Sequence, residues 1–218
     1  MMDRLAAVEE RIQEAARRSG RRREEITLVA ITKVFPASVI REAYARGLRD
    51  FGENYVQEFE SKAGELADLG GARFHFVGHL QSNKVRRAVE LFQVIQTIDS
   101  PKLAARIGAT GASMEVMLEV KIGDEASKSG VAPAGLPALI DSVRACPNLR
   151  LAGLMTMPPW SDNAEDSRPY FRQLRSLAEQ HGLRALSIGT SYDFEAAIEE
   201  GATHIRVGTA LFGLRRKP

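Results

Sequence analysis

The chain has 218 residues, 44% of them hydrophobic and 27% charged, which suits one compact soluble domain with a sizeable core. The 30 lysine and arginine residues against 28 acidic residues leave a net charge of +2, and this near balance argues against a dedicated nucleic-acid binder. A single cysteine, Cys146, excludes an internal disulfide and a multi-thiolate metal site, and no run of 18 apolar residues predicts a membrane span.

The first segment, residues 1–19, predicts an amphipathic helix. Leu5, Val8, Ile12 and Ala15 recur at helical spacing, with glutamate and arginine residues between them. Because charges are spread through this segment, it lacks the apolar stretch of a secretory leader. We therefore expect a cytoplasmic protein that forms one domain over residues 1–218.

After residue 20 the chain alternates between short apolar runs and helical patterns. Eight segments have the composition of buried strands: 26–32, 48–52, 73–78, 92–98, 114–120, 149–155, 184–189 and 203–208. Helical stretches lie between several of them, as at 37–47, 83–92 and 191–201. Strand–helix alternation is typical of parallel strands joined by crossover helices. Eight such units predict an α/β fold, a single (β/α)8 TIM-type barrel with an extra N-terminal helix.

An open doubly wound sheet is the alternative fold. Such a sheet usually has a glycine-rich phosphate turn after its first strand. The corresponding segment here, TKVFP at residues 32–36, contains no glycine. The sequence therefore favours the closed barrel.

Polar residues follow the predicted strands, at the end of the barrel where barrel enzymes do their chemistry. Lys33 follows the first strand and Asn54 the second. A lysine at the end of a buried strand is partly desolvated, which lowers the pKa of its ammonium group, and a neutral amine can form a Schiff base with a carbonyl compound. The alternatives for Lys33 are a side chain that reaches solvent or one that pairs with an acid.

Two segments near the C-terminus, SIGTSYDFEAAIEE at 187–200 and IRVGTALFG at 205–213, predict an anion site. Ser191 stands at a predicted helix start, where it either caps the helix or binds phosphate together with exposed N–H groups. Gly208 lets an anion approach the backbone, and Thr209 adds a hydroxyl. Barrels frequently hold phosphate between the loops after strands seven and eight. A reactive lysine with a phosphate site suggests pyridoxal 5′-phosphate, with an aldolase acting on a sugar phosphate as the alternative.

A family resemblance rests on six segments that occur in order along almost the whole chain: LVAITKVFP, FGENYVQE, FHFVGHLQSNK, DEASKSGV, GLMTM and SIGTSYDFEAAIEEGATHIRVGTALFG. By these segments the chain resembles the YggS/PROSC family of pyridoxal-phosphate homeostasis proteins, which are similar to the barrel domain of alanine racemase. The resemblance implies a lysine aldimine with the cofactor, a phosphate site, a guanidinium facing the pyridine nitrogen and an amide beside the ring. The residues implied for these roles are Lys33 for the aldimine, Ser191, Gly208 and Thr209 for the phosphate, Arg206 for the nitrogen and Asn54 for the ring.

Arg206 bears on the expected activity. Its guanidinium stays protonated, so it would donate to the pyridine nitrogen and keep that nitrogen unprotonated, which makes the ring a weak electron sink. We therefore expect a pyridoxal phosphate-binding protein of vitamin B6 and amino-acid/keto-acid homeostasis, without robust catalysis. The alternative is a PLP-dependent amino-acid racemase with weak one-base activity of Lys33. Alanine racemase takes its second base from an added β domain, for which the residues after the eighth strand leave no room.

The remaining candidates concern metals and partners. His75 and His79 are four residues apart, which on a strand means about 13 Å, too far for one metal ion. We therefore predict no metal site. Lys128 either contacts an anion or pairs with Asp124 to fold its loop. The expected partners are pyridoxal phosphate and the apoenzymes that require it, with no nucleic acid and no membrane, and we expect a monomer.

Overall fold

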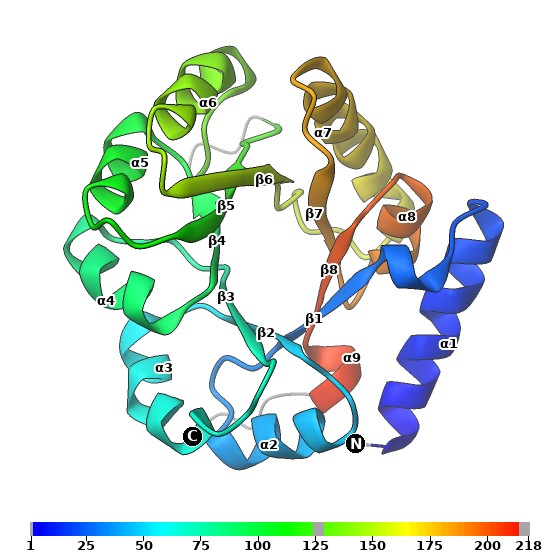
Figure 1. The fold of residues 1–218 in the computed structure, drawn as a ribbon. Helices are drawn as coiled ribbons and strands as arrows, with labels where there is room; N and C mark the ends of the chain where they lie inside the picture. The colour runs from blue at the N-terminus through cyan, green and yellow to red at the C-terminus, as the bar shows by residue number, and fades with distance from the viewer. Residues whose placement is uncertain (1, 124–128, 214–218) are drawn as a thin grey trace.

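The computed structural model describes residues 2–123 and 129–213, and its centre is a closed barrel of parallel strands in the order β1 to β8 (Figure 1). β1 pairs with β8 to close the barrel, so no strand edge is left open. This confirms the predicted (β/α)8 barrel. The strands are β1 Thr27–Ile31, β2 Asp50–Glu53, β3 Arg73–Phe76, β4 Val94–Ile98, β5 Met114–Glu119, β6 Leu149–Met155, β7 Ala185–Thr190 and β8 His204–Val207.

The helices form a ring around the barrel, and α1 lies outside this ring next to α8 (Figure 1). Arg11 of α1 pairs with Glu195 of α8 at 2.7 Å, which confirms an added N-terminal helix. None of the helices within residues 2–123 and 129–213 is long and apolar enough to cross a membrane. The helices are α1 Met2–Arg18, α2 Ala37–Ala45, α3 Val56–Ala63, α4 Val85–Leu91, α5 Pro101–Gly108, α6 Leu136–Arg144, α7 Arg168–Gln180, α8 Phe194–Glu199 and α9 Thr209–Phe212.

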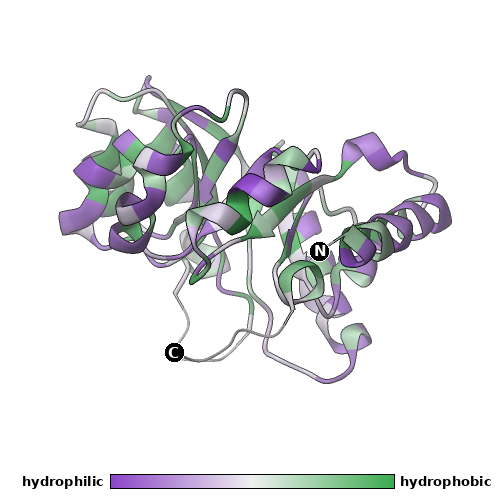
Figure 2. Ribbon diagram, turned by 90° about the horizontal axis from the view of Figure 1, so that it is seen from below, coloured by the Kyte–Doolittle hydropathy of each residue, from purple (hydrophilic) through white to green (hydrophobic). Residues whose placement is uncertain are grey.

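The hydrophobic core lies between the barrel wall and the inner faces of the helices. All five residues of β4 are buried, as expected for a parallel strand covered on both sides. Phe59 of α3 packs against Phe74 and Phe92, with ring centroids 4.6 and 4.9 Å apart. Figure 2 shows mostly hydrophobic strands and helices whose exposed faces are hydrophilic. This packing holds the strand ends, and hence the site, in fixed positions.

One predicted element differs in a way that matters for the site. The helix expected to begin at Ser191 begins at Phe194. The carboxylate of Asp193 accepts hydrogen bonds from the backbone N–H and the hydroxyl of Thr190, at 2.7 and 2.9 Å, which holds residues 190–193 in a turn. The predicted helix start at Ser191 is therefore wrong. Lys128 and Asp124 lie outside the described residues.

Candidate functional site

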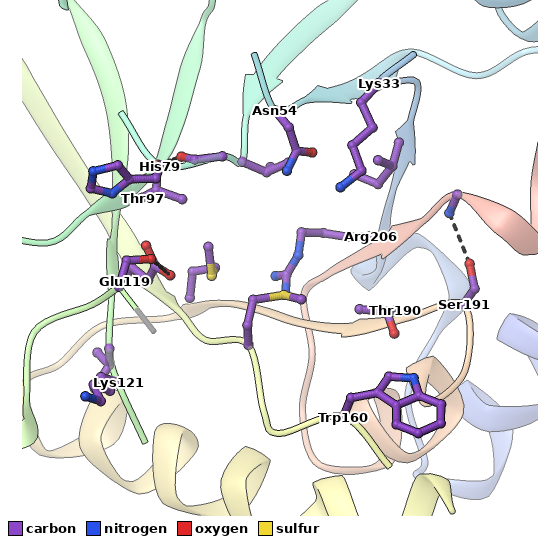
Figure 3. A pocket seen from close by; sticks show the side chains of 18 of the residues that line it. Lys33, Asn54, His79, Thr97, Glu119, Lys121, Trp160, Thr190, Ser191 and Arg206 are labelled. Carbon is purple, nitrogen blue, oxygen red and sulfur yellow. Dashed lines mark hydrogen bonds between the residues drawn. The ribbon is translucent and has the colours of Figure 1, made fainter. Parts of the chain in front are cut away.

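A cavity of about 540 Å³ opens at the carboxyl ends of the strands (Figure 3). This volume lies within the usual range for small-molecule sites. Parallel strands of a barrel all end on the same face, so residues far apart in sequence meet there. All six residues predicted for the site line this cavity: Lys33, Asn54, Ser191, Arg206, Gly208 and Thr209.

The amine side of the cavity is formed by the ends of β1 and β2. Lys33 lies in a turn that closes with a hydrogen bond of 3.1 Å from the N–H of Phe35 to the carbonyl of Thr32. Figure 3 shows the side chains of Lys33 and Asn54 extending into the cavity from these neighbouring strand ends. A primary amine and a neutral amide therefore face the same space.

Arg206 of β8 forms the floor of the cavity and is only 5% exposed. Its Nη1 donates to the carbonyl and the hydroxyl of Ser187, each at 2.7 Å, and its Nη2 donates to the carbonyl of Thr156 at 2.9 Å. Burial lowers the pKa of Arg206 to about 10, although the charge of Asp193 opposes this effect. The guanidinium thus remains charged at neutral pH and is held in one orientation.

A chain of polar side chains supports Arg206 from inside the barrel. The Ser187 hydroxyl donates to Gln96 Oε1 at 2.6 Å, Gln96 Nε2 lies 3.0 Å from His75 Nδ1, and His75 Nε2 lies 2.8 Å from Asp50 Oδ1. Because an amide nitrogen only donates, His75 Nδ1 must accept and the proton sits on Nε2. Burial lowers the pKa of His75, which agrees with a neutral ring.

The two histidines weighed as metal ligands have different surroundings. His75 is fully buried in this chain, whereas the His79 side chain is 61% exposed and its Nδ1 lies 3.7 Å from Asp99 Oδ2. Among the residues that the structure describes, no group of three histidine, cysteine or acidic side chains is arranged to hold a metal ion. His75 is therefore committed to the support of Arg206.

The opposite side of the cavity offers hydrogen-bond donors for an anion. The hydroxyl of Ser191 accepts from the backbone N–H groups of Gly208 and Ala210, at 3.1 and 3.2 Å. These bonds join the loops after β7 and β8 and leave the hydroxyl proton of Ser191 free to turn towards a ligand. A Cβ on Gly208 would lie 3.3 Å from Cβ of Ile31, so glycine allows this close approach to β1. Thr209, the first residue of α9, adds a second hydroxyl.

The far wall contains a buried acid that the sequence analysis did not single out. Glu119, at the end of β5, is 6% exposed, and its Oε1 accepts from the hydroxyl of Ser129 at 2.8 Å. Within the described part of the chain, its Oε2 has no hydrogen-bond partner. Burial raises the pKa of this carboxyl, although Ser129 opposes the effect.

The sequence contained a weak signal for the polar chain that supports Arg206. Ser187, Gln96 and His75 interrupt otherwise apolar strand segments, and a polar residue inside a buried strand needs a partner. The sequence could not identify the partner, since Ser187 and Gln96 are 91 positions apart.

Comparison with known proteins gives a consistent set of relatives. Residues 4–216 match the family model for the N-terminal domain of alanine racemase. A protein of Pseudomonas aeruginosa named pyridoxal phosphate homeostasis protein is 47% identical, over 97% of this chain and 94% of its own length. An Escherichia coli protein of the same name is 43% identical, over 97% of this chain and 95% of its own length.

Solved structures show the same relationship. The structure of PipY from Synechococcus elongatus with PLP bound has a TM-score of 0.80 and 41% identity, and covers 87% of this chain and 93% of that one. Alanine racemase from Corynebacterium glutamicum has a TM-score of 0.70 at 21% identity, and covers 97% of this chain but 61% of that one. At this lower identity the likeness is one of fold.

Proposed function

The chain belongs to the family of pyridoxal phosphate homeostasis proteins, and from this premise we propose that it binds pyridoxal 5′-phosphate as a Schiff base on Lys33. Its role is then in vitamin B6 and amino-acid/keto-acid homeostasis, without robust catalysis. The observation that carries the proposal is that Lys33, Arg206 and Ser191 line one and the same cavity.

The donor set of the cavity fits this cofactor. When bound, pyridoxal phosphate supplies an aldehyde that condenses with a primary amine. Lys33 offers the amine, and the hydroxyls of Ser191 and Thr209 offer donors for the phosphate.

Arg206 accounts for the expected lack of robust catalysis. A pKa of about 10 keeps it a donor at neutral pH, and a donor facing the pyridine nitrogen leaves that nitrogen unprotonated. The supporting chain through Ser187 and Gln96 holds this donor in place. Asn54 lies beside the ring in this arrangement.

The cellular setting of the protein is also a proposal. Apoenzymes that require pyridoxal phosphate are the partners to which the cofactor passes. In this proposal the protein acts as a monomer in the cytoplasm.

The test compares variants of two lysines that line the same cavity, Lys33 and Lys121. Apoprotein mixed with pyridoxal phosphate and reduced with borohydride should carry one pyridoxyl group on Lys33, located by peptide mass spectrometry. Lys33→Ala should stay unlabelled and colourless, and Lys121→Ala should behave like the wild type. Full cofactor stoichiometry on Lys33→Ala would refute the Schiff base as the main binding mode.

Catalysis is tested separately. The protein loaded with pyridoxal phosphate and incubated with L-alanine should yield negligible D-alanine, measured by chiral chromatography. Turnover comparable to that of a racemase would reverse the proposal in favour of an isomerase.

A further inference from the structure

An ion triad with two buried members, Lys62 and Glu53, lies directly behind the turn that carries Lys33. Lys62 of α3 places its Nζ 2.8 Å from Glu53 Oε1 and 2.9 Å from Glu58 Oε1. The Lys62 side chain is 6% exposed and that of Glu53 is fully buried. Glu53 ends β2, and Glu58 lies one helical turn before Lys62 on α3, so the triad joins β2 to α3.

Every member of the triad also binds the turn itself. Lys62 Nζ donates to the carbonyls of Phe35 and Thr32, at 2.9 and 3.3 Å. Glu58 Oε1 accepts from the backbone N–H of Val34 at 2.6 Å. Glu53 Oε1 accepts from the Thr32 hydroxyl at 2.7 Å. Lys62 and Glu58 thus hold the backbone on both sides of Lys33, and Glu53 holds the side chain of Thr32.

The conformation held in this way is an unfavourable one. Val34 has a φ of 64°, a left-handed conformation that β-branched residues rarely adopt. In a turn of this kind the position is normally occupied by glycine. Val34 is 56% exposed, so packing of its own side chain does not impose the conformation. The bond from its N–H to Glu58 and the bonds of the two flanking carbonyls to Lys62 do so.

A stability role alone is a poor explanation for such a triad. Burial raises the pKa of Glu53 against the opposing effect of Lys62, and buried ion pairs contribute little net stability compared with well-packed apolar residues. Backbone strain that surrounding groups over-determine is typical of functional sites. The turn it constrains contains the residue on which the proposed function rests.

We propose that Lys62, together with Glu53 and Glu58, is a positioning residue that fixes the Thr32–Phe35 turn so that the amine of Lys33 is presented to the cavity. This inference rests on the proposed function of Lys33. It assigns to the triad no contact with the cofactor. The triad acts through the backbone of residues 32–35, whose orientation decides where the Lys33 side chain leaves the chain.

The experiment uses three variants of the full chain and one control. Lys62→Met removes the cation, and Glu53→Gln added to it removes the carboxylate charge left behind. Glu58→Gln keeps an acceptor for the Val34 N–H but weakens the bond to Lys62. The control is Arg168→Met. Arg168 pairs with Glu199 and Glu200, its side chain is 18% exposed, and it does not line the cavity.

Two readouts separate positioning from stability. The first is hydrogen exchange of the Val34 amide in apoprotein, which needs no cofactor. We expect about tenfold faster exchange in Lys62→Met and in the double variant, the equivalent of one lost hydrogen bond to a charged group. The second is the affinity for pyridoxal phosphate and the pH dependence of its absorbance. We expect about tenfold weaker binding and a displaced pH profile, with Glu58→Gln changed in the same direction and Arg168→Met unchanged.

The outcomes are distinct. If the double variant regained wild-type exchange and binding, the effect would come from an unpaired Glu53 charge, and the positioning role would be overturned. It would also be overturned if Lys62→Met and Arg168→Met lost stability alike with no change at Val34 or in the pH profile. Wild-type protein could fail to bind pyridoxal phosphate at Lys33 while exchange of the Val34 amide still rose in Lys62→Met. The proposed function would then fail, and the role of the triad in fixing the turn would stand.

Discussion

The stability of the barrel should fall in mild acid because of His204, at the start of β8. Its Nδ1 lies 2.9 Å from the Thr203 hydroxyl, and its ring centroid is 6.3 Å from that of His75. Burial lowers the pKa of His204 from 6.5 to about 4, and the neighbouring His75 acts in the same direction, whereas Asp50 opposes it. The folded state therefore keeps this ring neutral at pH values where the unfolded chain protonates it.

The sign and size follow from proton linkage. A histidine with a depressed folded-state pKa contributes stability that is complete above pH 6.5 and is lost as the pH falls towards about 4. The loss is about 1.4 kcal/mol per pH unit in this window, so about 3.5 kcal/mol over the whole window is an upper bound for this partly exposed ring. Between pH 7.5 and pH 5, His204 alone should account for about 2 kcal/mol.

Urea denaturation at pH 7.5 and pH 5 measures this effect. His204→Asn keeps a hydrogen-bonding group near the position of Nδ1 but cannot protonate, so it should lose about 2 kcal/mol less than the wild type between the two pH values. His181→Asn, at the end of α7, is the control for the loss of a histidine elsewhere in the chain. The comparison removes the contribution of groups far from His204, whereas His75 and Asp50, which act on its pKa, belong to the same effect. An equal loss in wild type and His204→Asn would refute a neutral buried His204.

Two further substitutions test the packing and the hydrogen bonds beneath the site. Gly78→Ala would place a Cβ 2.1 Å from the Asn54 carbonyl. It should therefore cost about 1–3 kcal/mol of stability in urea denaturation and weaken pyridoxal phosphate binding. The control Gly64→Ala, whose Cβ would have no atom within 4 Å, should be tolerated. Gln96→Leu leaves the buried Ser187 hydroxyl without its acceptor and should cost about 1–3 kcal/mol by the same assay; an unchanged midpoint would show that this bond contributes nothing.

Much of the fold was predictable because it depends on local patterns. A strand buried on both faces needs a continuous apolar run such as that of β4, and a covering helix needs apolar residues at helical spacing, as in α1. These patterns repeat eight times, and parallel strands place their ends on one face. The position of Lys33 just after such a run was therefore enough to predict where it would lie.

The error and the omissions have different causes. The helix expected at Ser191 starts later because the Asp193 carboxylate binds Thr190, a local bond that competes with helix formation. Lys62 and Glu53 look like ordinary surface charges in the sequence. Lys62 also lies four residues after Glu58, a spacing that is typical of an exposed pair on a helix. Their burial becomes evident only when α3 brings Lys62 against Glu53 and the turn after β1.

The sequence by itself determined the strand and helix periods, and with them the closed barrel and the end of it at which Lys33 lies. Only the tertiary structure decided which polar groups meet: Arg206 with Ser187, Ser187 with Gln96, and Lys62 with the turn around Lys33. The physical reason is that periodicity depends on neighbours along the chain. The partners of a buried charge, and its pKa, depend on which distant segments exclude water from it after the barrel closes.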